Sequence, residues 1–241
     1  MPFTLAHPAA AVPLLRVLGK FGGLSALVIG SIVPDLHHIF HVERTFTHSL
    51  SGVFSFDLPA GLFCYLLFHF FLKRPLCALF PEELAFRLAP LAETSLPAVP
   101  WFGVLLSLLA GSLTHVGWDA LTHGDTFGFP FLGFLDKPLF FSLSFSDLLQ
   151  AGSSVLGVWL LLDWSGKWLA HAERKAPEFP LTDGKVTLLL AFSALPFAIL
   201  AAKDGGGLLN TVSAPIAAWL NAMTYAITAY AAIWHFRERK K

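Results

Sequence analysis

The chain has few charged residues, and this scarcity indicates its class. Of its 241 residues, 13% are charged and 55% are hydrophobic, whereas an average soluble domain has about 25% charged residues. Several apolar runs reach the roughly 20 residues that are needed to cross the hydrocarbon core of a bilayer. The composition therefore predicts an all-α, polytopic helical membrane protein, and it excludes an ordinary soluble domain.

The chain also lacks a net charge and a cysteine framework. Its formal net charge is zero and its longest charged run is the C-terminal RERKK, so we expect no nucleic-acid partner. Cys64 and Cys77 are too few for a disulfide framework or a Cys-rich metal site. No residue pattern identifies a protein partner. The N-terminus lacks the basic start and the cleavage site of a signal peptide, so we interpret it as retained mature sequence.

Five apolar segments are long enough to be transmembrane helices. They cover Leu50–Leu72, Trp101–Thr122, Asp147–Ala170, Val186–Ala202 and Leu208–Phe236. A sixth region, Ala9–Val33, is split by Gly22-Gly23 and has two interpretations, namely a sixth span or a helical hairpin that enters the membrane halfway. The hairpin would bring His7 back beside Asp35.

Basic residues predict how these segments are oriented. They follow the first and the fifth span and also lie between the third and the fourth, and the positive-inside rule assigns these places to the cytoplasm. The connector 75–100, with a short amphipathic helix, is then cytoplasmic, while Pro34–Ser49 and the loop 123–146 share the opposite face. We expect residues 1–241 to form a single integral membrane domain.

The motif THVGWDALTHG at the end of the second span is the clearest candidate for a functional site. Its spacing, His115-x3-Asp119-x3-His123, puts three side chains on one face of a helix. Imidazole and carboxylate groups are ligands for zinc, manganese and iron. Because His115 and His123 lie about 12 Å apart along a regular helix, either the helix ends near Thr122 or Asp119 is shared by two ions about 3.5–4 Å apart.

The alternative to a metal-binding role is a structural role for these three side chains. A lone histidine in a membrane helix often only bonds a neighbouring helix. Three ionisable groups on one stripe are different, because each costs roughly 2–3 kcal/mol to insert near the bilayer centre. That cost favours a metal or catalytic role.

The stretch GSIVPDLHHIFHVERTFTHSL supplies complementary groups on the same predicted face. Asp35 follows an apolar run, so its carboxylate emerges where the chain leaves the membrane. His37 and His38 are adjacent and point in different directions, so at most one of them joins Asp35. His48 opens the next span, where neighbouring hydroxyls can orient it or cap the helix.

Two further residues have competing interpretations. Arg44 is a candidate clamp for an anionic substrate group such as phosphate, or it pairs with Glu43 or Glu93. Asp57, in the triplet Asp57-Leu58-Pro59, is either a metal ligand or a cap at a helix start.

The segments MPFTLAHPAA, GSIVPDLHH, RTFTHSL and FDLPAGL resemble the DUF4184 family of bacterial membrane proteins. The order of an early His, Pro-Asp-x-x-His, Arg-x-x-Thr-His-Ser and His-x3-Asp-x2-Thr is more distantly similar to YdjM-type membrane-bound metal-dependent hydrolases. The resemblance implies a multi-pass protein of the bacterial inner membrane with a hydrolase site. The matching positions are His7, Asp35, His38, His48, His115 and Asp119. The hydrolases tend to have Pro-Asp-x-Asp-His, and here His37 takes the place of the second Asp, which alters metal preference or removes a bridging ligand.

These observations predict a metal-dependent hydrolase that acts on a lipid-linked or amphipathic substrate, with a phosphoester as one candidate, at the extracytoplasmic surface. The expected cofactor is one or two divalent ions, zinc first, with manganese or iron as alternatives. The expected metal ligands are Asp35, His38, His48, His115 and Asp119, with His7 and His123 as further ligands or proton-transfer groups and Arg44 as the anion clamp. The alternatives are a transporter or ion carrier, which would line a path toward the midplane, and a non-catalytic membrane protein with a structural metal site.

Overall fold

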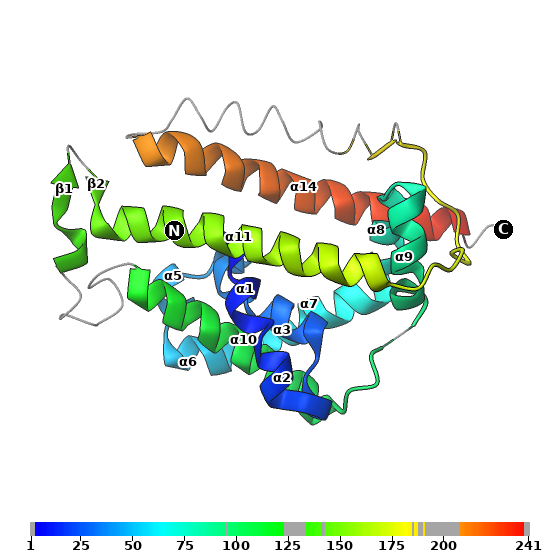
Figure 1. Ribbon diagram of the computed structural model, residues 1–241, viewed down its shortest axis with the longest axis horizontal. Helices are drawn as coiled ribbons and strands as arrows, with labels where there is room; N and C mark the ends of the chain where they lie inside the picture. Colours follow the sequence, from blue (N-terminus) through cyan, green and yellow to red (C-terminus); the bar gives the residue numbers. More distant parts are fainter. Residues whose placement is uncertain are drawn as a thin grey trace. The chain divides into compact units, whose positions relative to one another are not determined.

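The computed structural model describes residues 3–94, 96–122, 134–140, 143–184, 186–187, 190 and 208–238. Most of these residues are helical (Figure 1), and β1 (Pro138–Phe140) and β2 (Leu143–Ser144) form a small antiparallel pair. The predicted all-α class is therefore confirmed. The chain falls into two compact units, residues 1–66 with 96–171 and residues 67–95 with 172–241. The single membrane domain stays a prediction.

Three helices in the described part of the chain are long and apolar enough to cross a membrane. They are Leu50–Leu79 with 30 residues, α10 (Trp101–Thr122) with 22 and α11 (Phe145–His171) with 27. They match the first three predicted spans. The predicted span Val186–Ala202 lies almost wholly outside the described residues, and α14 (Leu208–Glu238) covers the fifth but is not among the three. These three helices are consistent with a membrane protein, and the count of five spans is not confirmed.

The N-terminal region is built from short helices. They are η1 (Thr4–Ala6), α1 (Pro8–Ala11), α2 (Leu14–Leu18), η2 (Gly19–Phe21) and α3 (Leu24–Gly30). Gly19 has a φ of 53°, a left-handed conformation that glycine adopts without a steric penalty. The Thr4 hydroxyl donates a hydrogen bond of 2.5 Å to Asp35 Oδ2. The region therefore folds back toward Asp35, as the hairpin interpretation predicts, and the alternative of one long spanning helix is wrong.

Helix α3 packs directly against the backbone of α10. A Cβ atom on Gly30 would lie 2.2 Å from the carbonyl oxygen of Leu108, and one on Gly111 would lie 2.4 Å from that of Leu27. The Ser112 hydroxyl also donates a hydrogen bond to the Gly30 carbonyl at 3.2 Å. Glycine at both positions is what allows so close an approach, and the approach fixes the end of α3 beside the next turn of α10.

The first spanning helix contains two π-helical turns. It consists of α6 (Leu50–Gly52), η4 (Val53–Asp57), α7 (Leu58–Leu67), η5 (Phe68–Leu72) and α8 (Lys73–Leu79). Each π turn comes just before a proline, Pro59 or Pro75, whose missing N–H breaks the α-helical ladder. Asp57 therefore lies within the helix. The interpretation of Asp57 as a cap at a helix start is wrong, because Ser49 caps this helix by accepting the Gly52 N–H at 3.0 Å.

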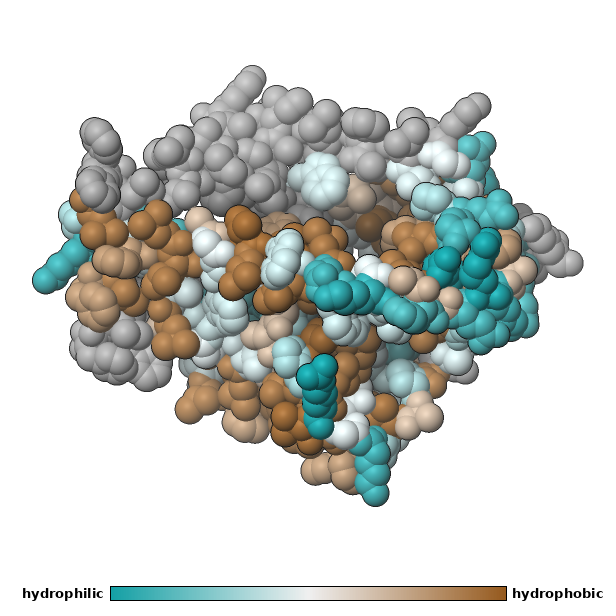
Figure 2. Space-filling model, in the orientation of Figure 1, coloured by the Kyte–Doolittle hydropathy of each residue, from teal (hydrophilic) through white to brown (hydrophobic). Residues whose placement is uncertain are grey.

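Helix α11 contacts α1 and α10 (Figure 1), and within the described part of the first unit one of its faces is exposed. Val155, Trp159 and Leu162 on this face have exposed fractions of 72%, 59% and 68%. Figure 2 shows mostly hydrophobic residues over the left half of α11. An uncovered apolar face of this size on a 27-residue helix is typical of contact with lipid.

The second unit is held together by a small apolar core and by surface ion pairs. Its helix α9 (Glu82–Glu93) buries an alanine face formed by Ala85, Ala89 and Ala92, which confirms the short amphipathic helix that was predicted in the connector 75–100. Lys175 pairs with Glu93 at 2.5 Å and with Glu178 at 3.2 Å. The side of the membrane on which this helix lies stays a prediction.

Candidate metal centre

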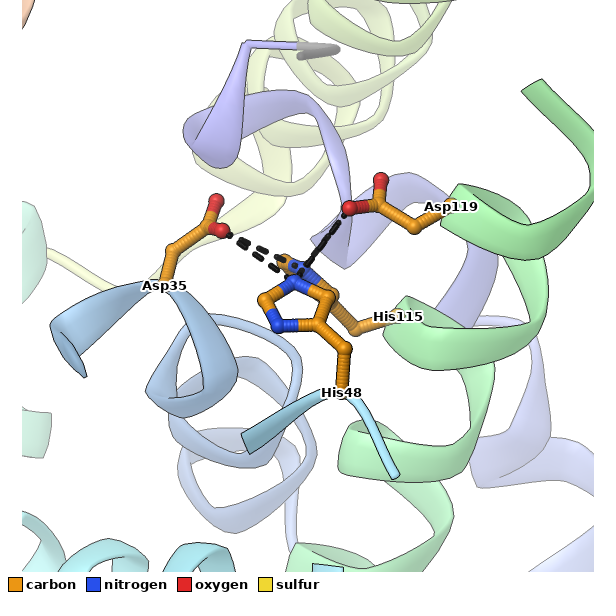
Figure 3. Close-up of side chains that lie close together, drawn as sticks. All are labelled: Asp35, His48, His115 and Asp119. Atoms are coloured by element: carbon orange, nitrogen blue, oxygen red, sulfur yellow. Dashed lines mark hydrogen bonds and ion pairs between the residues drawn. The ribbon is translucent and has the colours of Figure 1, made fainter. Parts of the chain in front are cut away.

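Four buried side chains from three parts of the first unit meet at one point (Figure 3). Asp35 is in η3 (Val33–Leu36), His48 directly follows α5 (Arg44–Thr47), and His115 and Asp119 are one turn apart in α10. One ligand atom from each residue lies within 4.8 Å of the ligand atoms of the other three. The two predicted halves of the site therefore meet.

The distances around this point fit a four-coordinate divalent ion. His48 Nε2 lies 3.5 Å from Asp35 Oδ1, 3.3 Å from Asp119 Oδ2 and 3.3 Å from His115 Nε2. His115 Nε2 lies 3.5 Å from Asp35 Oδ1 and 3.8 Å from Asp119 Oδ2. Ligands at the usual zinc bond length in a tetrahedron are about 3.3–3.4 Å apart. Four of these five separations are therefore close to tetrahedral edges, and the fifth, between His115 Nε2 and Asp119 Oδ2, is longer at 3.8 Å.

Both imidazoles are held so that Nε2 faces the centre. His115 Nδ1 lies 2.7 Å from the Ser31 carbonyl oxygen, and His48 Nδ1 lies 3.1 Å from the Arg44 carbonyl oxygen and 3.0 Å from the Thr47 hydroxyl. A carbonyl oxygen can only accept, so Nδ1 carries a hydrogen and Nε2 is the ring nitrogen that is left to bind an ion. Metal-binding histidines are usually oriented by such a second hydrogen bond. The expected role of a hydroxyl beside His48 is confirmed.

The two carboxylates each turn one oxygen to the centre and the other to a protein partner. Asp35 accepts from Thr4 through Oδ2, while its buried Oδ1 accepts no hydrogen bond of good geometry from the described residues. Asp119 Oδ2 accepts from Arg44 Nη2 at 3.0 Å, and Asp119 Oδ1 lies 3.3 Å from His7 Nε2. A buried carboxylate oxygen without a hydrogen bond is costly, and a cation at the centre would remove that cost.

The electrostatics of the site favour bound positive charge. Burial opposes the ionisation of Asp35, but the imidazoles of His115 and His48 hold its pKa well below its usual range. Burial also opposes a charge on His48, but the carboxylates of Asp119 and Asp35 raise the pKa of His48 to about 9. Without a metal, a proton on His48 therefore partly balances the two carboxylates.

His7 lies beside the centre and outside the group of four. It is buried, and its ring packs edge-on against His115 with 3.8 Å between the ring centroids. Burial and the nearby His115 lower the pKa of His7 to about 4, so the ring is neutral at pH 7. A neutral imidazole is able to accept a proton.

The family assignment follows from the comparison with known proteins. The family described as "Domain of unknown function (DUF4184)" matches residues 1–235. The chain belongs to DUF4184. No curated protein and no solved structure matches it. The assignment confirms the resemblance in the N-terminal motifs. Because the function of this family is unknown, the biochemical activity has to be inferred from the site.

Within this DUF4184 chain, the structure brings together part of the predicted ligand set. Asp35, His48, His115 and Asp119 converge, and His7 and Arg44 both contact Asp119. The side chain of His38 and the whole of His123 lie outside the described residues. The described part of α10 ends at Thr122, so the two predicted alternatives for the end of this helix stay open.

Other neighbours have roles that differ from the predictions. His37 Nδ1 lies 3.2 Å from the Pro34 carbonyl oxygen. The buried carboxylate of Asp57 accepts a hydrogen bond from the Ser112 hydroxyl at 3.3 Å. Of the two alternative partners proposed for Arg44, which were Glu43 and Glu93, Glu93 binds Lys175 in the second unit.

Two contributors to this DUF4184 site had not been predicted. Thr4 supports Asp35 through its hydroxyl, and the Ser31 carbonyl orients His115. A backbone carbonyl leaves no trace in a sequence, because every residue has one. The hint for Thr4 was its position three residues before His7 in a region that folds back on the site.

Proposed function

We propose that this DUF4184 protein is a metal-dependent hydrolase of the bacterial inner membrane that acts on a lipid-linked or amphipathic substrate at the extracytoplasmic surface. The observation that carries the proposal is the convergence of two carboxylates and two imidazoles at near-tetrahedral separations. Zinc fits these separations best, and manganese and iron are the alternatives. One ion suffices for the four ligands described.

We assign a different role to each group of residues around the centre. Asp35, His48, His115 and Asp119 would hold the ion. A bound divalent ion lowers the pKa of a coordinated water and polarises the bond to be cleaved. His7 is neutral at pH 7 and lies 3.3 Å from Asp119, so it would accept the proton of the attacking water. Arg44, the most exposed of these groups, would meet the substrate.

The location near a membrane surface supports a lipid-linked or amphipathic substrate. Two of the ligands are in the last turns of α10, a helix long and apolar enough to span a bilayer. The other two are in or next to short helices that precede the span Leu50–Leu79. Both positions correspond to the end of a span, where lipid head groups lie. The basic residues of the connectors support the extracytoplasmic side.

The proposal is tested with the full chain in nanodiscs that contain phosphatidic acid or phosphatidylcholine. After loading with zinc, manganese or iron, release of phosphate, fatty acid and head group is measured. We expect release from one lipid that is abolished in Asp119→Ala and retained in Asp163→Ala, a change in an exposed carboxylate on α11. Release that persists in Asp119→Ala would contradict the proposal.

A structural metal centre is the second candidate, and the same geometry favours it. Zinc held by four protein ligands is the usual arrangement in structural sites, whereas catalytic zinc keeps one position for water. The metal then stabilises the fold without turnover. Stoichiometric metal with no release from any lipid, together with a lower melting temperature after chelation, would favour this candidate over the hydrolase.

A further inference from the structure

Asp57 is a buried carboxylate inside the helix Leu50–Leu79, one of the three that are long and apolar enough to cross a membrane. It is 1% exposed and is the last residue of the π turn η4. Its Oδ2 atom accepts from the Ser112 hydroxyl at 3.3 Å, whereas its buried Oδ1 accepts no hydrogen bond from any described residue. Carboxylates inside spans are costly and usually mark ion or substrate sites, and π turns are frequent at functional sites.

The nearby histidines do not complete the surroundings of Asp57. His48 and His115 act on Asp57 through space, but no hydrogen bond or ion pair joins either ring to it. The Nε2 atoms of both rings instead lie 3.3–3.8 Å from carboxylate oxygens of Asp35 and Asp119. Any positive charge on the rings therefore acts first on those two carboxylates, and a cation close to Asp57 would stabilise it further.

Three oxygen atoms from three segments meet beside Asp57. Ser112 Oγ of α10 lies 3.3 Å from Asp57 Oδ2 and 3.2 Å from the carbonyl oxygen of Gly30 at the end of α3. A hydroxyl has one hydrogen, and a carbonyl or an ionised carboxylate can only accept. Both separations are also longer than the roughly 2.7–2.8 Å that is usual for a hydroxyl donor. One shared hydrogen therefore serves two acceptors poorly, whereas a cation can bind all three oxygens.

The separations and the charge of these oxygens indicate the kind of cation. Oxygen ligands about 2.3–2.6 Å from an ion, the range for calcium, lie roughly 3.3–3.7 Å apart in an octahedron. The two measured separations are at the lower end of this range, which excludes larger ions such as potassium. A single carboxylate balances a single charge, and buried charges are stable only when they are paired. Sodium has nearly the radius of calcium and one charge, so it fits both conditions.

We infer that Asp57, Ser112 and the Gly30 carbonyl form a sodium site that is separate from the candidate metal centre. Asp57 Oδ1 adds a fourth oxygen, because carboxylates also bind ions through both oxygens. The ion links η4, α10 and α3 where their backbones approach closely. Gly30 directly precedes Ser31, whose carbonyl orients His115, so the sodium ion also stabilises the backbone next to the divalent centre. The inference does not depend on that centre holding a metal.

The test measures the melting temperature of the full chain in nanodiscs, in sodium, potassium or choline chloride at equal ionic strength. A chelator of divalent ions is present throughout, so the result is independent of the divalent centre. Binding of radioactive sodium to the same samples gives the number of ions per chain. The variants are Asp57→Asn and Ser112→Ala. Their matched controls are Asp163→Asn, in an exposed pair with Lys167, and Ser153→Ala, whose hydroxyl donates within its own helix.

We expect the wild type to bind about one sodium ion per chain, which unlabelled sodium displaces and the same concentration of potassium does not. Sodium at about ten times its dissociation constant should raise the melting temperature by about 3 °C or more over choline. Asp57→Asn should abolish both effects, because it removes the charged ligand. Ser112→Ala should raise the dissociation constant for sodium about fivefold or more, and both control variants should match the wild type.

Three results would overturn the inference. The first is a wild type that binds no sodium and melts at one temperature in all three salts, since a proton or water would then complete the surroundings of Asp57. The second is equal stabilisation by sodium and potassium. The third is sodium binding that Asp57→Asn and Ser112→Ala both leave unchanged, which would place the ion elsewhere. If Asp57→Asn does not fold in any salt, Ser112→Ala and sodium binding to the wild type decide the outcome.

Discussion

The two units of this protein use ionisable residues in opposite ways. In the second unit, Lys175 is exposed and lies between Glu93 and Glu178, so opposite charges meet one another at the surface. In the first unit, Asp35 and Asp119 are buried and point to a common centre together with two imidazoles. In the surface pairs each charge faces an opposite charge. The buried group, by contrast, brings two carboxylates of like charge close together.

This difference indicates which cluster has a function beyond folding. Exposed ion pairs contribute little to stability and are common on protein surfaces. Buried carboxylates are rare unless they are paired or bind a metal. The convergence of Asp35 and Asp119 on two oriented imidazoles therefore forms a group that could hold a metal ion, whereas the pairs around Lys175 only connect a loop to a helix.

The largest expected effect comes from removing one ligand of the buried group. Asp119→Ala should reduce bound metal from about one ion per chain to less than a tenth of that, because only three of the four ligands and one of the two carboxylates remain. Metal content is measured by mass spectrometry after purification. Glu93→Ala, which removes a carboxylate from the surface network, should leave the metal content unchanged. Equal losses in the two variants would remove the distinction between the units.

The second prediction concerns pH. Because the pKa of His48 is raised to about 9 without metal, its ring is protonated below that value and must lose a proton to bind an ion. The metal association constant should therefore rise about tenfold per pH unit between pH 6.5 and 8.5 and level off above pH 9. His7, whose pKa is about 4, and Asp35 are already deprotonated in this range and add no slope. Competition with a chelator of known pH dependence measures the constant, and a flat profile would contradict this assignment.

The third prediction uses two glycines of α10. A Cβ on Gly111 would lie 2.4 Å from the Leu27 carbonyl oxygen, whereas one on Gly117 would meet nothing within 4 Å. Gly111→Ala should therefore separate α3 from α10, weaken the contact between His115 and Ser31, and lower metal affinity roughly tenfold or more. Gly117→Ala should leave metal affinity unchanged. Chelator competition and thermal melting compare the two, and equal behaviour would show that this packing does not support the centre.

The smallest expected effect is that of Thr4→Val. This change removes the hydroxyl that donates to Asp35 Oδ2 and keeps the size of the side chain. Loss of such a supporting hydrogen bond typically lowers metal affinity about tenfold. Thr114→Val is the matched control, because its hydroxyl donates to the Gly111 carbonyl of its own helix at 2.7 Å. An unchanged affinity in Thr4→Val would mean that Asp35 is positioned by other contacts.

The sequence was informative where residue types and helical periodicity decide the outcome. His115 and Asp119 were predicted as ligands because a four-residue spacing puts them on one helix face, and Asp35 and His48 because they border apolar spans. The sequence also predicted that these two pairs of residues lie on the same side of the membrane, because successive spans alternate in direction and the basic residues mark the cytoplasmic ends. Helical spacing and the position of a residue next to an apolar span are local features, so they can be recognised in a single sequence.

Other features could not be predicted, because they depend on packing. Whether Ala9–Val33 spans or folds back is decided by the close approach of α3 and α10, which brings together residues some 80 positions apart. One of the two interpretations of Asp57, a helix cap, rested on Asp-Leu-Pro being common at helix starts, whereas here the helix begins at Leu50 and accommodates Pro59 with a π turn. The Ser31 carbonyl that orients His115 has no sequence signature.

The central claim is that Asp35, His48, His115 and Asp119 together bind one divalent ion, and X-ray absorption spectroscopy of the zinc-loaded full chain tests it most directly. We predict a first shell of nitrogen and oxygen ligands at about 2.0–2.2 Å, with the outer-shell scattering of two imidazoles, of which one is lost in His115→Ala. A spectrum without imidazole scattering, or one that His115→Ala leaves unchanged, would contradict the account.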